Sequence, residues 1–166
     1  MKYLQPIFLI IMLCLIAACG KPGDQVPEGY YSYNTGEVQA AVDHLSFTPE
    51  LPDYIPIPMV SVVSDKYEEN QHEMMDVSFY TEANDLLSIE ITKGDQNNEW
   101  IEPQKVSIDH QIDGIYEDNR FAKQLSWTKD GITYTLSFRE SVSPDPRDEQ
   151  SVTKEHLIEV ARSFHL

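Results

Sequence analysis

Residues 125–139, with the sequence LSWTKDGITYTLSFR, decide the fold. From Ile132 onward, apolar and polar residues alternate, which is the pattern of a strand with one buried and one solvated face. The pair Asp130-Gly131 precedes this run, and a tight turn of the mirror type needs residues that tolerate a positive φ. The segment therefore predicts an antiparallel β-hairpin.

The same alternation appears twice upstream, in residues 75–80 and 87–92. A longer hairpin loop is expected between them, at residues 81–85. Further turns are expected at Asn97-Asn98 and at Asp113-Gly114, because Asn, Asp and Gly favour turns. Together these segments predict an antiparallel meander sheet of about six or seven strands.

Helical periodicity is found on either side of these strands. Asn34 is a candidate helix cap, with Glu37 reaching back to it. The apolar stripe that follows consists of Val38, Ala41, Val42 and Leu45. Thr153 is the expected cap of a final helix, whose stripe consists of Leu157, Val160, Ala161 and Phe164. The predicted fold is α+β, with a short N-terminal helix and with the C-terminal helix packed on one face of the sheet.

A proline-dense run separates the first helix from the first strand. Prolines at this density exclude a helix or a central strand. The apolar residues between them predict an extended segment that lies across apolar surface. The prolines concerned are Pro49, Pro52, Pro56 and Pro58.

Residues 1–18 have the layout of an export signal, with Lys2 followed by an unbroken apolar run of twelve residues. This run is shorter than the roughly 20 residues of a membrane-spanning helix and matches the roughly 7–15 residues of a signal-peptide core. Its end, Ile16-Ala17-Ala18-Cys19, looks like a bacterial lipobox. We expect cleavage between Ala18 and Cys19 and a diacylglyceryl group on Cys19, which makes the membrane a partner of the chain.

The expected organisation is a lipoprotein signal peptide (1–18), a tether (19–36) and a single α+β domain (37–166). The tether is rich in glycine and proline. Tyr30, Tyr31 and Tyr33 interrupt it, and either the membrane interface or the domain is a suitable surface for them. Cys14 leaves with the signal, so the domain is expected to fold without a disulfide although it faces the outside of the cell membrane.

Composition and motifs exclude several classes of function. The net charge of −16 disfavours nucleic acid as a partner. None of the five histidines forms a His-x-x-x-His pair, and the Asp95, Asn97, Glu99 spacing lacks the glycine and glutamate of a calcium loop. No cofactor, metal ligand or catalytic residue is predicted. A Ser-His-Asp site assembled from distant residues stays open, because triads are defined by geometry.

Aromatic residues in and near the strands are expected to be core, and a ligand groove is the alternative. They are Trp100, Tyr116, Trp127, Tyr134 and Phe138.

Four segments carry a resemblance to a known family: residues 47–56 (FTPELPDYIP), 112–116 (IDGIY), 125–136 and 153–163 (TKEHLIEVARS). The chain from about Asn34 onward resembles a domain of unknown function found in lipoproteins and membrane-tethered ectodomains of Gram-positive bacteria. The resemblance implies an extracytoplasmic α+β domain, sometimes joined to stress-signalling anti-sigma proteins. It implies no catalytic residue.

The sequence therefore predicts a lipid-anchored extracytoplasmic domain that binds or senses a protein or cell-envelope ligand without enzymatic activity. Two alternatives are a hydrolase of envelope polymers and an accessory lipoprotein that docks a membrane protein complex.

Overall fold

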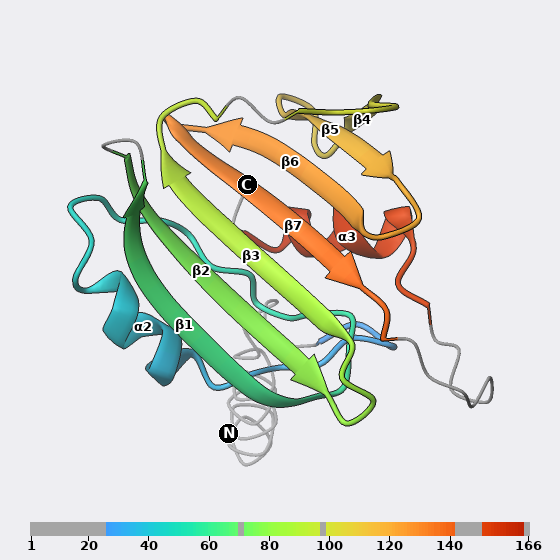
Figure 1. Cartoon of the computed structure of the whole chain (residues 1–166), viewed down its shortest axis with the longest axis horizontal. Helices are drawn as coiled ribbons and strands as arrows, with labels where there is room; N and C mark the ends of the chain where they lie inside the picture. Colours follow the sequence, from blue (N-terminus) through green and yellow to red (C-terminus); the bar gives the residue numbers. More distant parts are fainter. Residues whose placement is uncertain (1–25, 70–71, 97–98, 142–150, 165–166) are drawn as a thin grey trace, which may run out of the picture.

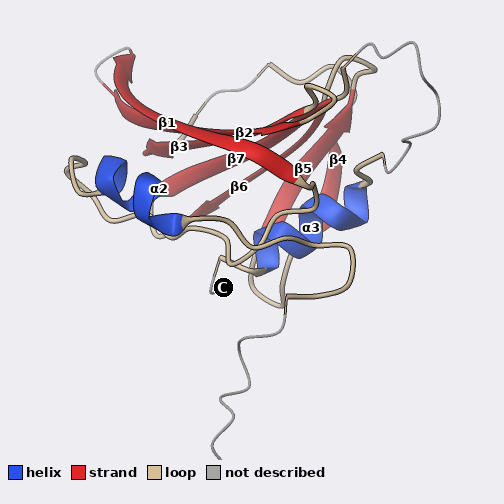
Figure 2. Cartoon of the chain, turned by 90° about the horizontal axis from the view of Figure 1, so that it is seen from below, coloured by secondary structure: helices blue, strands red, loops and turns tan. Residues whose placement is uncertain are grey.

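The computed structural model describes residues 26–69, 72–96, 99–141 and 151–164. Seven strands form one antiparallel sheet in the order β1-β2-β3-β7-β6-β5-β4. Both described helices lie on the same face of this sheet (Figures 1 and 2), and the predicted α+β class is confirmed. The elements are α2 (Thr35–Val42), β1 (Met59–Glu69), β2 (His72–Thr81), β3 (Leu86–Lys93), β4 (Gln104–Ser107), β5 (Asp113–Asp118), β6 (Lys123–Lys129), β7 (Ile132–Arg139) and α3 (Lys154–Arg162).

The sheet consists of two meanders joined side by side. Strands β1 to β3 form the first, strands β4 to β7 form the second, and β3 pairs with β7 from Leu86↔Arg139 to Lys93↔Ile132. The chain must therefore pass from β3, in the middle of the sheet, to β4 at its far edge. Residues 94–96 and 99–103 are the described part of this passage, and we call them the β3–β4 connection.

Two of the predicted turns are confirmed. Asp130 and Gly131 have φ values of 51° and 75°, and Lys129 pairs with Ile132 across them, as a mirror-type turn requires. The loop between β2 and β3 closes where the Thr81 amide donates to the Asp85 carbonyl at 3.1 Å. The expected turn at Asn97-Asn98 lies outside the described residues.

The turn predicted at Asp113-Gly114 is wrong, because these residues begin β5. Gly114 pairs with Trp127 and Val106 inside the sheet. A Cβ at residue 114 would stand 2.9 Å from the Ile108 side chain and 3.0 Å from the Ser126 carbonyl. The glycine is there for close packing rather than for a turn, and the chain reverses at residues 108–112 instead.

The core lies between the sheet and the helices. As predicted, Val38 and Val42 of α2 are buried, and so are Leu157, Val160, Ala161 and Phe164 from the α3 stripe. The predicted caps are also present: Asn34 accepts from the Gly36 amide at 3.1 Å, and Thr153 accepts from the His156 amide at 3.3 Å. Of the aromatic residues, four are core, as expected: Tyr116, Trp127, Tyr134 and Phe138.

The proline-dense segment and the three early tyrosines pack on the helix-bearing side. Ile55 and Ile57 are buried, as the extended segment predicted. Tyr31 forms an antiparallel bridge with Ile55, and the Tyr33 hydroxyl donates to the Pro52 carbonyl at 2.8 Å. The rings of Tyr30 and Tyr54 meet edge-on, with their centroids 5.1 Å apart. The sequence left open whether these tyrosines lie against the membrane interface or the domain, and in the structure they contact the domain.

The expected signal peptide, Ala18 and Cys19 lie outside the described residues. Within the part of the chain that is described, no helix has the length and apolar character needed to cross a membrane.

Candidate functional site

The face of the sheet turned away from the helices, here called the open face, carries a polar groove. Figure 1 looks onto this face, and Figure 2 shows it edge-on above the helices. The groove has a volume of about 390 Å³ and takes its lining from β2, β3, β7, β6 and the β3–β4 connection. The lining residues are Asp76, Ser88, Glu90, Gln96, Glu99, Gln124, Thr135, Ser137 and Arg139.

Strand register arranges polar residues in and beside the groove into two rows. In the first, Asp65 of β1 pairs with Asp76 of β2, which pairs with Glu90 of β3. We call these three residues the acid row. The second row consists of residues with hydroxyl or amide side chains that pair in succession across β2, β3, β7 and β6, namely Ser78, Ser88, Ser137 and Gln124.

The acid row places like charges directly opposite one another, which destabilises an antiparallel pair. Burial raises the pKa of Asp76 most, and the nearby carboxylates of Glu90 and Asp65 raise it further. A hydrogen bond from the Ser78 hydroxyl at 2.7 Å and the charge of Arg139 act in the opposite direction. No lysine or arginine among the described residues forms an ion pair with this row.

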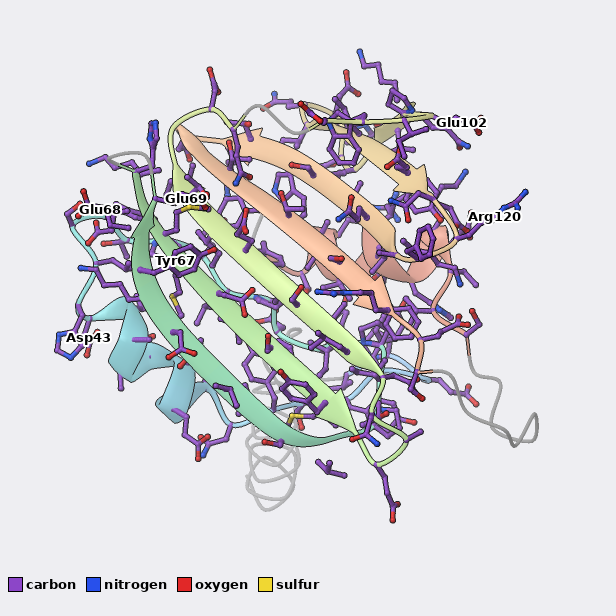
Figure 3. The ribbon with its side chains drawn as sticks, viewed as in Figure 1. Asp43, Tyr67, Glu68, Glu69, Glu102 and Arg120 are labelled. Carbon is purple, nitrogen blue, oxygen red and sulfur yellow. The ribbon has the colours of Figure 1, made fainter. Side chains whose placement is uncertain are left out.

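Glu90 is held in place by neutral donors. The Tyr67 hydroxyl donates to one carboxylate oxygen at 3.2 Å, and the Gln96 amide donates to the other at 2.6 Å. Figure 3 shows Tyr67 leaning from β1 over the neighbouring strands. Burial and the charge of Glu90 raise the pKa of Tyr67, so its hydroxyl stays a donor at neutral pH. Glu90 is therefore oriented without being neutralised.

The floor of the groove contains a hydroxyl group that bonds to no described neighbour. Ser137 is only 9% exposed, yet its hydroxyl makes no hydrogen bond to any described residue. Buried polar groups normally find a partner, so this hydroxyl is available to a bound molecule or water. Thr135 beside it differs, because its hydroxyl bonds to that of Ser126 at 3.0 Å.

The β3–β4 connection forms one wall and is fixed at both ends. The Gly94 amide donates to the Gly131 carbonyl at 2.8 Å. At the other end, the carboxylate of Glu117, which is 2% exposed, accepts from the backbone amides of Ile101 and Glu102 at 2.6 and 2.7 Å. These contacts hold the ends of the segment that brings Gln96 and Glu99 to the groove.

A second, smaller cavity of about 240 Å³ lies at the β5–β6 turn, around Arg120, Phe121 and Lys123. The Lys123 ammonium there already donates to Glu140 at 3.1 Å and to Ser151 at 2.6 Å. Because Lys123 already has these partners within the protein, this cavity is the weaker candidate for a binding site.

Of the described residues that the sequence offered as metal ligands or catalytic groups, Glu99 is the one that lines the groove. His156 belongs to the cap of α3, and the Nδ1 atom of His72 lies 3.3 Å from the Lys93 carbonyl oxygen, to which it donates when it carries the proton. In the described ranges, no group of three or more His, Cys, Asp or Glu side chains is placed to hold a metal ion. The groove residues were missed because they are ordinary polar positions of alternating strands, and only the register brings them together.

Comparison of the chain with protein-family models, with curated proteins and with solved structures finds no match. The family resemblance noted in the sequence therefore stays a prediction.

Proposed function

We propose that this chain is a lipid-anchored binding or sensing domain on the outer side of the cell membrane, without enzymatic activity, and that the groove takes its ligand. The observation that carries the proposal is the nearly buried Ser137, whose hydroxyl bonds to no described residue, in the groove that also holds the paired carboxylates of Asp76 and Glu90. A ligand would supply a partner for this hydroxyl and could relieve the repulsion between the two carboxylates.

The groove also has the size and rigidity that binding favours. Its volume falls in the range of about 300–1,000 Å³ that is usual for small-molecule sites. Its polar groups stand mainly on paired strands, so little conformational freedom remains to be lost when a ligand arrives.

A crosslinking experiment tests the groove. A photoreactive amino acid is introduced at Gln124, in the groove lining, and separately at Glu82, an exposed residue of the β2–β3 loop. After illumination of intact cells, we expect an adduct at Gln124 that is absent at Glu82. Identical adduct profiles at the two positions would refute the groove as the binding site.

Membrane attachment is tested at the predicted lipobox. Cys19→Ala is expected to abolish incorporation of labelled palmitate and to leave an uncleaved precursor. Cys14→Ala, which changes the other cysteine of the chain, is the matched control and should be labelled like the wild type. Unlabelled wild-type protein would contradict the lipid anchor.

The alternative of an envelope-polymer hydrolase has one observation in its favour. Asp76 and Glu90 are directly paired carboxyl groups, and a carboxyl whose pKa is raised suits a general acid. Release of reducing sugar from cell-wall polysaccharide, lost in Asp76→Asn, would support this alternative over binding alone.

A docking role would require a broad exposed apolar patch. The most exposed large apolar side chains are Val60, Ile101 and Phe121. They come from three separate elements, namely β1, the β3–β4 connection and the β5–β6 turn. We therefore do not propose docking as the function.

A further inference from the structure

We propose that the groove selects its ligand by a protonated primary amine, which binds between the carboxylates of Asp76 and Glu90. This inference rests on the proposed function, because it names the chemical class of the ligand that the same groove takes.

The first argument is the balance of charge. Asp65, Asp76 and Glu90 stand side by side on three adjacent strands, and Glu99 lines the groove beside them. Arg139 is the one cation among the described lining residues, and although its charge acts on Asp76, it makes no ion pair with a described residue. A cationic group placed between Asp76 and Glu90 would remove the repulsion that the two cross-strand pairs create.

The second argument is the remaining capacity for hydrogen bonds. Asp76 accepts one bond, from Ser78, and each oxygen of Glu90 accepts one, from Tyr67 and from Gln96. A carboxylate offers about four acceptor positions, so both groups keep free lone pairs. An ammonium group carries three donors and is matched to two carboxylates with a neighbouring hydroxyl.

The third argument comes from the hydroxyl row, independently of the charges. Ser137 is nine-tenths buried, lines the groove and has an unpartnered hydroxyl, and it pairs directly with Ser88 on β3. Ser88 in turn lies two residues from Glu90 on the same face. The body of the ligand should therefore carry hydroxyl or amide groups that reach these serines while the amine reaches the acid row.

Three sugars distinguish the need for an amine from the need for hydroxyl groups. All three carry hydroxyl groups, but D-glucosamine also has a primary amine, N-acetyl-D-glucosamine has an uncharged amide in its place, and D-glucose has a further hydroxyl group there. We expect the full chain in phosphatidylcholine nanodiscs at pH 6 to bind glucosamine at least tenfold more tightly than the other two, measured by calorimetry.

Variants locate the effect. Glu90→Gln is expected to weaken glucosamine binding at least tenfold, whereas Glu82→Gln removes the same charge outside the groove and should change nothing. Ser137→Ala should lower the affinity for each of the sugars that binds, because it removes a hydrogen bond to the hydroxyl groups that all three share.

Each failure has a distinct meaning. Equal binding of glucosamine and N-acetylglucosamine, still sensitive to Ser137→Ala, would overturn the amine and leave the groove as a binding site. Another outcome is that calcium chloride displaces glucosamine at equal concentration, whereas sodium chloride of the same ionic strength does not. This result would overturn the amine as the ligand group in favour of an inorganic cation. Binding of none of the sugars would also overturn the amine, while the crosslink at Gln124 tests the groove separately.

Discussion

Replacing Asp76 with asparagine is expected to stabilise the ligand-free domain. Asp76 faces Asp65 on one side and Glu90 on the other. Like charges directly opposite in a sheet cost about 0.2–1 kcal/mol per pair, so the substitution relieves about 0.4–2 kcal/mol. The bond from Ser78 becomes a neutral one and loses part of its strength, roughly half. The expected net gain in the free energy of unfolding is about 0.5–1 kcal/mol.

The dependence on pH provides the sharper signature. Because the pKa of Asp76 is raised in the folded protein, the native state holds its proton more firmly than the unfolded state does. The free energy of unfolding contributed by this group is therefore highest below its ordinary pKa and falls as the pH rises through the raised value. Asparagine cannot titrate, so the advantage of Asp76→Asn should be full at pH 7 and shrink as the pH falls toward 4.

Urea unfolding of the full chain measures both effects, with the fluorescence of buried Trp127 as the signal. The variant, the wild type and Glu82→Gln are compared at pH 7, 5.5 and 4. Glu82→Gln controls for the loss of one negative charge from an acidic protein. A variant less stable than the wild type at pH 7, or a difference that does not change with pH, would refute the electrostatic account of the acid row.

Three further outcomes are expected. Leu157→Ala should destabilise by about 2–5 kcal/mol in urea unfolding, because this fully buried side chain anchors α3 to the sheet. Gly114→Ala should destabilise by about 1–3 kcal/mol, since its methyl group would press on the Ser126 carbonyl, and unchanged stability would show that β5 can move aside. Hydrogen bonds from Lys66 and from the Ser46 amide lower the pKa of Glu73 to about 2, so this group should contribute stability above about pH 4.5 that is lost as the pH falls toward 2. Acid unfolding followed by circular dichroism should lose that dependence in Lys66→Met.

Local pattern was enough to predict most elements of the fold. The alternation around Val77, Ile89 and Leu136 marks one side of each strand, and all three are buried. The side-chain period of a strand is set by its backbone, so this signal needs no knowledge of the neighbouring strands. The turn prediction at Asp113-Gly114 failed because the same dipeptide suits both a turn and a crowded strand. Only the position of Ile108 decides between the two.

The groove was beyond local pattern for a different reason. Which strands are neighbours depends on how the two meanders join, and β3 meets β7 from a distant part of the chain. The alternation placed Ser137 on a wet face, whereas the structure leaves it 9% exposed beside residues of the β3–β4 connection. The apposition of Asp76 with Glu90 follows from the register of the β2–β3 hairpin, which alternation alone does not specify.

The place of β7 has a consequence for the order of folding. It is the last strand in the chain, yet it stands at the centre of the sheet. As the protein is synthesised, the first three strands emerge well before the one that closes the edge of β3. Pairings between such distant segments form slowly. A ribosome-bound fragment that stops at Gly131 would leave the inner edges of β3 and β6 unpaired, and the native sheet can assemble only when nearly the whole polypeptide is available.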